Sequence, residues 1–253
     1  MSLLTVSIIV FMCIFGSALL GMLLATVIPK HHVSPDTRDV VKTAMATVAT
    51  LAALVLGLLT ADAKTGLDQK EEELRRMATQ VILLDRSMAE YGPQTQDARA
   101  LLKPTLAARI SQIWGDEPAG EVTTGAIAHG AGIETIQQKL LTLSPQNDAQ
   151  RWLQSKALQV SNDIMMARWS VFQQIESRIH WPFLIILVFW LAVVFTSVGL
   201  FAPRNAIAVT ALFFAALSIA GSIYLILAMD QPYSGIIKIS SSPLRAALEQ
   251  LGR

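Results

Sequence analysis

Four long apolar segments constrain this chain more than any other feature of its sequence. A helix needs about 20 apolar residues, at a rise of about 1.5 Å each, to cross the hydrocarbon core of a bilayer. Four segments reach that length without a charged side chain: residues 3–28, 43–61, 181–201 and 206–229. We therefore predict an all-α membrane protein with four transmembrane helices, surrounded by the lipid bilayer.

Charged residues gather between the second and third apolar segments. Residues 62–180 hold 28 of the 39 Asp, Glu, Lys and Arg side chains of the chain. The remainder has far fewer charges than the surface of a water-soluble domain. The sequence thus predicts transmembrane helices in 1–61, a helical extramembrane domain in 62–180, a transmembrane hairpin in 181–229 and a tail in 230–253.

The overall charge and the cysteine content exclude several classes of protein. A net charge of +1 lacks the strongly basic surface of a nucleic-acid-binding protein, so we expect no nucleic acid as partner. The single cysteine, Cys13, excludes an intramolecular disulfide and a cysteine-rich metal site. We expect no metal and no other cofactor.

The first apolar segment and the basic residues bear on topology. The segment lacks a basic leading region and is too long for a signal peptide, so we expect a retained anchor. Four spans place both termini and the polar domain on one side of the membrane. By count, Lys and Arg near the helix ends favour a cytoplasmic position for that side, although the short loops compete by density. We expect a multi-pass membrane protein.

The polar domain has the pattern of a helical bundle. From Leu67 to Tyr91 apolar residues recur every three or four positions, as in a heptad stripe, and Gly92-Pro93 stops the helix. Further helices are expected over 94–114 and 134–143, joined by a glycine-rich connection, and over 144–180. Ser144-Pro145 is expected to cap the last of these.

We expect the second and third spans to run directly into this domain, so that their extensions form its bundle. The apolar stripes then either pack within one chain or join the subunits of a homo-oligomer, and the sequence leaves both arrangements open. In the tail, Ser242-Pro243 is expected to cap a short amphipathic helix. That helix is expected to dock on the bundle; the alternatives are the membrane surface and a cytoplasmic exit.

Several short motifs give the chain a family resemblance. The motifs are Ala53-Leu54-Val55-Leu56-Gly57-Leu58-Leu59 with Ala63-Lys64, Leu84-Asp85-Arg86, Tyr91-Gly92-Pro93, Arg151-Trp152-Leu153-Gln154-Ser155, Gly199-Leu200-Phe201-Ala202-Pro203-Arg204-Asn205, Asp230-Gln231-Pro232-Tyr233-Ser234-Gly235 and Ser242-Pro243-Leu244-Arg245. Together, from about residue 50 to the end, they resemble the bacterial bestrophin-like membrane proteins, a domain family of unknown function. Bestrophins themselves are pentameric anion channels with four spans and cytoplasmic helical extensions, which the predicted architecture matches. No aromatic-rich neck motif occurs on the second span, so no bestrophin pore residue is transferred to this chain.

The second span carries the candidate pore-lining residues. They lie at helical spacing: Thr43, Thr47, Thr50, Leu54, Gly57 and Leu58. Threonine hydroxyls can line a hydrated path, and Leu54 with Leu58 can form a constriction that closes by dewetting. Close helix packing is the simpler interpretation, because Thr, Ala and Gly let membrane helices approach each other.

Polar motifs at the ends of the spans are further candidates. The membrane-exit motif is Asp230, Gln231, Pro232, Tyr233, Ser234 and Gly235. Asp230 can contribute to a charged ring or pair with Lys64, and the motif can equally be a turn with an interfacial tyrosine. Arg204 and Asn205 are expected to be an interfacial charge and a helix cap. Asp85-Arg86 is expected to be an ion pair or a helix–helix contact.

The spans contain no Asp, Glu, Lys, Arg or His side chain, which argues against a proton-coupled carrier but less against a channel. No catalytic constellation stands out elsewhere, so we expect the protein not to be an enzyme. The resemblance to bestrophins implies a homo-oligomeric channel for inorganic ions, anions first. The alternative is a non-conducting scaffold or regulator that acts through its helical domain.

Overall fold

The computed structural model describes residues 2–27, 35–115, 131–173, 181–230 and 237–252. Within these ranges the protein is all-helical and contains no strand. The elements are α1 (Leu3–Val27), α2 (Pro35–Tyr91), η2 (Pro93–Thr95), α3 (Gln96–Trp114), α5 (Ala131–Leu141), α6 (Asp148–Gln173), α7 (Trp181–Phe201), α8 (Ala206–Asp230) and α9 (Ser242–Gln250). They belong to two compact units. Unit 1 comprises Met1–Leu67 with Ser177–Gln231, and unit 2 comprises Asp68–Glu176 with Pro232–Arg253.

Four helices are long and apolar enough to cross a membrane: α1, α2, α7 and α8. Their positions agree with the four apolar segments of the sequence, except that α2 begins at Pro35 and not near residue 43. Arg38 and Lys42 therefore lie in the first turns of a helix, where Asp36 provides the negative charge that the positive end of the helix dipole favours.

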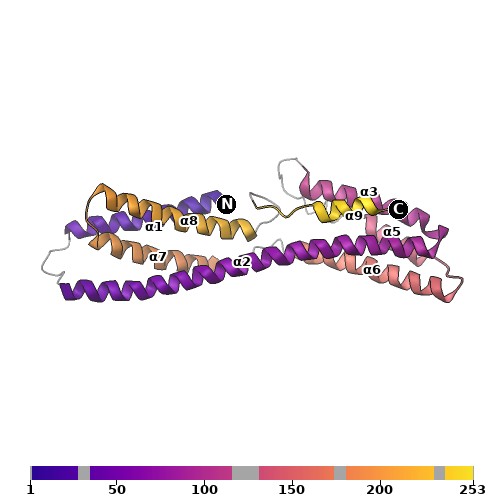
Figure 1. Ribbon diagram of the computed structural model, residues 1–253, viewed down its shortest axis with the longest axis horizontal. Coiled ribbons are helices and arrows are strands. Elements are labelled where there is room, and N and C mark those ends of the chain that lie inside the picture. Colours follow the sequence, from indigo (N-terminus) through magenta and orange to yellow (C-terminus); the bar gives the residue numbers. More distant parts are fainter. Residues whose placement is uncertain (1, 28–34, 116–130, 174–180, 231–236, 253) are drawn as a thin grey trace. The chain divides into compact units, whose positions relative to one another are not determined.

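Unit 1 is built around α1, which packs against both α7 and α8 (Figure 1). The backbones of α1 and α7 approach each other closely along their contact, which we call the α1–α7 seam. A Cβ atom on Gly199 would collide with the carbonyl of Ala18, and one on Gly21 would collide with the carbonyl of Thr196. Small residues permit this proximity, which suits membrane helices whose association depends on close packing.

The α2 helix is continuous for 57 residues, so the second span does extend into the polar part of the chain (Figure 1). It ends at Gly92, whose φ of 124° and ψ of −171° lie in a region that essentially only glycine adopts. The short η2 turn follows before α3 starts. Whether α6 continues into α7 concerns residues outside the described ranges.

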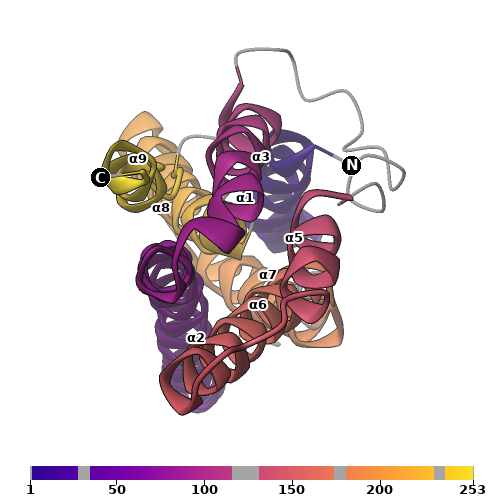
Figure 2. The same ribbon diagram turned by 90° about the vertical axis from the view of Figure 1, so that its right-hand side faces the viewer.

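Unit 2 has its own apolar core. The α2 stripe is buried at Leu74, Val81, Leu84, Met88 and Tyr91. The α6 stripe is buried at Leu153, Ala157, Val160 and Ile164. Both stripes therefore pack within one chain over these residues. The α5 and α6 helices lie side by side (Figure 2), and α9 packs against α3, as expected for a docked tail helix.

Several predicted helix starts in unit 2 are wrong by one to four residues; α5, for example, begins at Ala131 and not at Glu134. The α6 helix begins at Asp148 and not at Ser144-Pro145, because Asn147 is its cap: Asn147 Oδ1 accepts a hydrogen bond of 2.8 Å from the Gln150 amide. In return, Gln150 Oε1 accepts one of 2.8 Å from the Gln146 amide. In the tail, the cap position of α9 is Ser241, with Ser242 as its first residue.

Candidate functional site

The α2 span leaves one face of itself uncovered in unit 1. In its most apolar stretch 6% of the residues are buried, against 28% in α1, 22% in α7 and 33% in α8. Ala52 is buried, and Val55, Leu56 and Leu59 pack against the core of the unit. One face of α2 therefore packs against the other helices of unit 1, and the opposite face does not.

The six candidate pore-lining residues all lie on the uncovered face. Thr43, Thr47, Thr50, Leu54, Gly57 and Leu58 are each exposed. Leu54 and Leu58 retain 68% and 67% of their accessible surface. The structure brings them together as one surface of one helix, although it does not test their role in a pore.

The threonine hydroxyls of this face are bonded to their own helix. Thr43, Thr47 and Thr50 donate to the carbonyls four residues earlier, at 2.9, 3.2 and 2.9 Å. Such bonds satisfy the hydroxyl in an apolar environment, and the hydroxyl can rotate to donate to water or an anion instead. The face is therefore compatible with lipid, with another helix and with a hydrated path.

The uncovered face of α2 differs in composition from those of the other spans. Exposed side chains on α1, α7 and α8 include many that are large and apolar: Leu4, Ile8, Met12, Leu20, Leu23, Phe183, Ile185, Phe189, Ile207 and Phe214. Such side chains suit contact with lipid chains. On α2 the face combines hydroxyls, alanine and glycine with leucine, a mixture that also suits helix packing or water.

The remaining candidates at the ends of the spans have separate roles. Asn205 caps α8, since its Oδ1 accepts a hydrogen bond of 2.8 Å from the Ala208 amide. Arg204 is exposed beside it. The proposed pairing of Lys64 with Asp230 stays a prediction. The rest of the membrane-exit motif, residues 231–235, lies outside the described residues.

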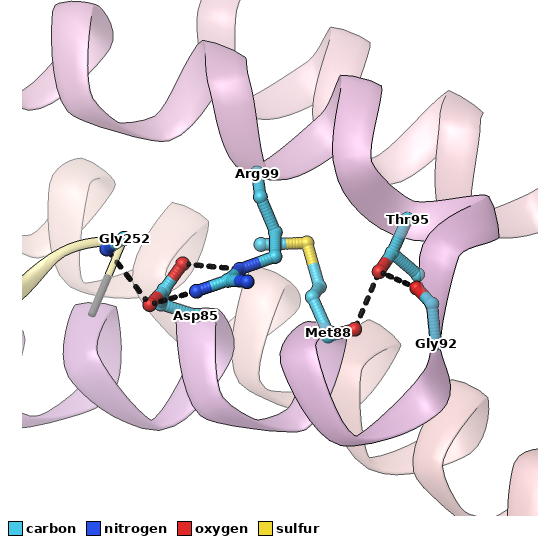
Figure 3. A network of polar contacts seen from close by, with 6 residues as sticks. All are labelled: Asp85, Met88, Gly92, Thr95, Arg99 and Gly252. Atoms are coloured by element: carbon cyan, nitrogen blue, oxygen red, sulfur yellow. Dashed lines mark hydrogen bonds and ion pairs between the residues drawn. The ribbon is translucent and has the colours of Figure 1, made fainter.

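A buried carboxylate holds three segments of unit 2 together (Figure 3). The Asp85 side chain on α2 is 4% exposed and accepts two hydrogen bonds of 2.9 Å from the Arg99 guanidinium on α3. The backbone amide of Gly252, at the end of the tail, donates a third of 3.2 Å. Asp85 thus makes a helix–helix contact with Arg99, while its sequence neighbour Arg86 is exposed.

The environment of Asp85 fixes its charge. Burial by itself would raise its pKa, but hydrogen bonds from Arg99 and Gly252 and the nearby positive charges outweigh burial, so the pKa lies below its usual value. The pKa of Arg99 is raised by its hydrogen bonds to Asp85 and by the negative charge of that carboxylate. Asp85 is therefore an ionised partner of Arg99 and has no surplus proton to exchange near neutral pH.

The tail closes over unit 2 as a strap, which we define as residues 237–252. At its start the Trp114 indole donates a hydrogen bond of 2.8 Å to the Ile239 carbonyl. In its middle Leu244, Ala247 and Leu251 are buried, and at its end Gly252 reaches Asp85. The strap gives the Asp85–Arg99 pair a structural explanation, in which one polar group fixes α2, α3 and the end of the tail.

Arg99 was missed in the sequence, although a signal for it exists. The turn at Gly92 reverses the chain between two helices, so residues equally far from it face each other. Asp85 lies seven positions before Gly92, and Arg99 lies seven after it. Thr95 contacts the same turn, donating to the Gly92 carbonyl at 2.8 Å and to the Met88 carbonyl (Figure 3).

Gln154, in the motif at residues 151–155, also has a clear role. Its side-chain amide donates to the carbonyls of Leu140 and Leu143 at 2.8 and 3.1 Å, at the end of α5. Gln150, just before the motif, donates to the Tyr91 carbonyl at 3.1 Å. Both glutamines satisfy carbonyls at or near helix ends. Gln154 and its near neighbour Gln150 therefore position helices in unit 2.

Four apolar helices together with a helical polar unit define a multi-pass membrane protein, and no group of three or more His, Cys, Asp and Glu in the described ranges is placed to hold a metal ion. The chain belongs to the Bestrophin-like family, whose Bestrophin-like domain model matches residues 12–244. No curated protein matches the chain, and no solved structure does.

Proposed function

We propose that this protein assembles as a homo-oligomer in a bacterial inner membrane and conducts small inorganic ions, anions first, along a path lined by α2. The uncovered face of α2 carries the proposal. A span that rests on its own chain by one face only has room for further helices on the other face. Copies of α2 around an axis would supply those helices and enclose the threonine hydroxyls.

Two further features support a path along α2. The four spans contain no Asp, Glu, Lys, Arg or His side chain, so hydroxyls and backbone groups are the main polar groups that a path could use. Leu54 and Leu58 lie on the same face as the threonines, where repeated copies would form an apolar constriction. Resemblance to bestrophins favours anions, and we place both termini and unit 2 in the cytoplasm.

Reconstitution in liposomes tests this function. Anion and cation flux is measured for the wild type and for Thr47→Leu, with Phe189→Leu as control because Phe189 is 62% exposed on α7. We expect anion flux in the wild type, a severalfold loss in Thr47→Leu and no change in the control. Equal flux in all three would contradict the choice of α2. Absence of flux from intact oligomers, under several ionic conditions, would contradict conduction.

Asp230→Asn tests the second expected contribution, near the cytoplasmic mouth. A carboxylate there changes the local concentration of ions by its charge, so we expect the variant to alter the anion-to-cation ratio more than total flux. An unchanged ratio would remove Asp230 from the path.

A scaffold or regulatory role is the second candidate, and one observation favours it. Unit 2 exposes large apolar side chains that its own fold does not cover, with Trp152 59%, Leu141 63% and Met166 62% exposed. Exposed apolar groups are typical of partner surfaces when they form a patch. Retention of a partner by wild-type protein, lost in Trp152→Ala, would support this role if no flux is found.

A further inference from the structure

The first turns of α2 reach back to the end of α7 through a cation. Arg38 Nη2 donates a hydrogen bond of 2.9 Å to the Phe201 carbonyl. The guanidinium carbon also lies 5.3 Å from the centroid of the Phe201 ring. Phe201 is the last residue of α7, where carbonyls lack intrahelical donors and the helix dipole favours a positive charge.

A helix with so little buried surface needs its orientation fixed in another way. The apolar contacts of the α2 span run along one narrow face that includes Ala52 and Val55. Rotation about that line of contact would cost few contacts. Arg38 opposes rotation, because a planar guanidinium that both stacks on a ring and donates to a carbonyl fixes direction as well as distance.

We propose that Arg38 is a positioning residue that fixes the rotation and tilt of α2, and thereby the direction in which the uncovered face points. The proposal rests on the proposed function only where it concerns flux. Its structural content, a contact between Arg38 and Phe201 that orients α2, stands whether or not the protein conducts.

The alternative to positioning is that Arg38 acts through its charge, by attracting anions to the mouth of a path. The charges around it argue against that role. Asp36, Asp39 and Lys42 share the first turns of α2, and Lys42 lies 4.0 Å from Asp39. Two acidic and two basic side chains cancel, so the first turns of α2 carry no net charge.

Spin labels test directly whether the contact between Arg38 and Phe201 orients α2. In a Cys13→Ser background, cysteines replace Leu23 on α1 and Val40 on α2, which are 66% and 69% exposed. Labelled protein is diluted with unlabelled protein, so that distances within one chain dominate. We expect a narrow distance distribution in the parent, and a broader or shifted one after Arg38→Gln or Phe201→Leu. Arg204→Gln, which removes an exposed cation from the α7–α8 connection, is the matched control and should leave the distribution unchanged.

Phe201→Leu separates positioning from charge, because it removes the ring and keeps every charge and the carbonyl. With flux as a second measurement, we expect Phe201→Leu and Arg38→Lys each to lower flux by roughly threefold to tenfold, as loss of a partly exposed cation–π contact with a weakened hydrogen bond would do. Oligomer size should not change, and the melting temperature should fall by no more than about 4 °C.

The outcomes distinguish the two ideas. An unchanged distance distribution in both Arg38→Gln and Phe201→Leu would overturn the positioning role. Altered distributions in a protein without flux would support positioning and contradict conduction. Full flux in Arg38→Lys and Phe201→Leu, with loss in Arg38→Gln alone, would assign Arg38 to the charge of the mouth and overturn the proposal.

Discussion

The two halves of α2 contrast sharply within one continuous helix. Over Asp68–Tyr91 its apolar stripe is covered by its own chain, with Leu84 and Met88 fully buried. Over Pro35–Leu67 Ala52 is buried, and Leu54 and Leu58 stay about two-thirds exposed. The chain thus supplies partners for the polar-domain half of the helix and leaves a face of the membrane half open.

The difference follows from the solvent of each half. In water an exposed apolar stripe has a large free-energy cost, so unit 2 must bury its stripe within the chain. In lipid an exposed leucine has no such cost, so the membrane half of α2 can stay uncovered within one chain. Its open face can then contact lipid, another helix or water. The open face therefore marks where the molecule can gain contacts.

The largest expected effect compares one leucine from each half. Leu84→Ala should lower the free energy of unfolding by about 2–5 kcal/mol, because it opens a cavity in a packed core. In dissociated subunits in detergent, Leu54→Ala should change it by less than about 0.5 kcal/mol, because its side chain has few partners within the chain. Thermal unfolding of the two variants, followed by circular dichroism, measures the difference. Equal losses would break the contrast between the two halves.

A second comparison concerns charge in the covered half. Asp85→Ala leaves Arg99 without its carboxylate. Because Arg99 retains 25% of its accessible surface, we expect a loss of roughly 2–3 kcal/mol, below that of a fully buried pair.

Arg86→Ala is the matched control for Asp85→Ala, since Arg86 is exposed on the same turn. It should change stability by no more than about 0.5 kcal/mol. Hydrogen exchange at α9 provides a local measurement, because release of Gly252 should speed exchange there. Equal exchange rates in the two variants would show that Asp85 does not hold the strap.

The third comparison sets a glycine in the α1–α7 seam of unit 1 against an open glycine position on α8. Gly199→Ala adds a Cβ where the Ala18 carbonyl already lies, so the helices must separate, at a cost of about 1–3 kcal/mol. Gly221→Ala on α8 meets nothing within 4 Å and should be neutral or slightly stabilising. Melting temperatures in detergent measure both. A neutral Gly199→Ala would contradict the close approach.

The smallest effect near neutral pH concerns Asp85 itself. Its pKa is lower in the folded protein than in the unfolded chain, so its contribution to stability is fully present above the unfolded value, about 4. That contribution is lost as pH falls through the folded pKa. Exchange protection of α9 attributable to Asp85 should be constant from pH 8 to about pH 5 and weaken only in stronger acid. Weakening already at pH 6 would contradict the lowered pKa.

Much of the fold can be predicted from the spacing of apolar residues and from the residues that begin or end helices. Charge-free segments of span length predict α1, α2, α7 and α8, because bilayer thickness leaves few alternatives. Gly92-Pro93 predicts the end of α2, since the backbone there needs a conformation that glycine alone tolerates. The sequence misplaces the α6 start because two nearby capping signals, Ser144 and Asn147, compete, and the hydrogen bond from the Gln150 amide favours Asn147.

The contacts that orient the helices are harder to predict. Arg38 and Phe201 are separated by 163 positions, and neither stands out from its neighbours in sequence. Their contact depends on how α2 packs against the other helices of unit 1, and local sequence patterns do not encode that packing. The role of Gly199 similarly requires knowing that α1 passes it. The candidate pore residues were recognisable as one helical face, whereas their exposure became evident only from packing in three dimensions.

Cross-linking between copies tests the central claim most directly, namely that the uncovered face of α2 meets α2 of neighbouring subunits. In a Cys13→Ser background, Leu54→Cys is compared with Phe189→Cys on α7, both in native membranes and treated with a short bifunctional maleimide. The account predicts covalent dimers with Leu54→Cys and few with Phe189→Cys. Dimers with Phe189→Cys and none with Leu54→Cys would contradict it and assign the open face of α2 to lipid.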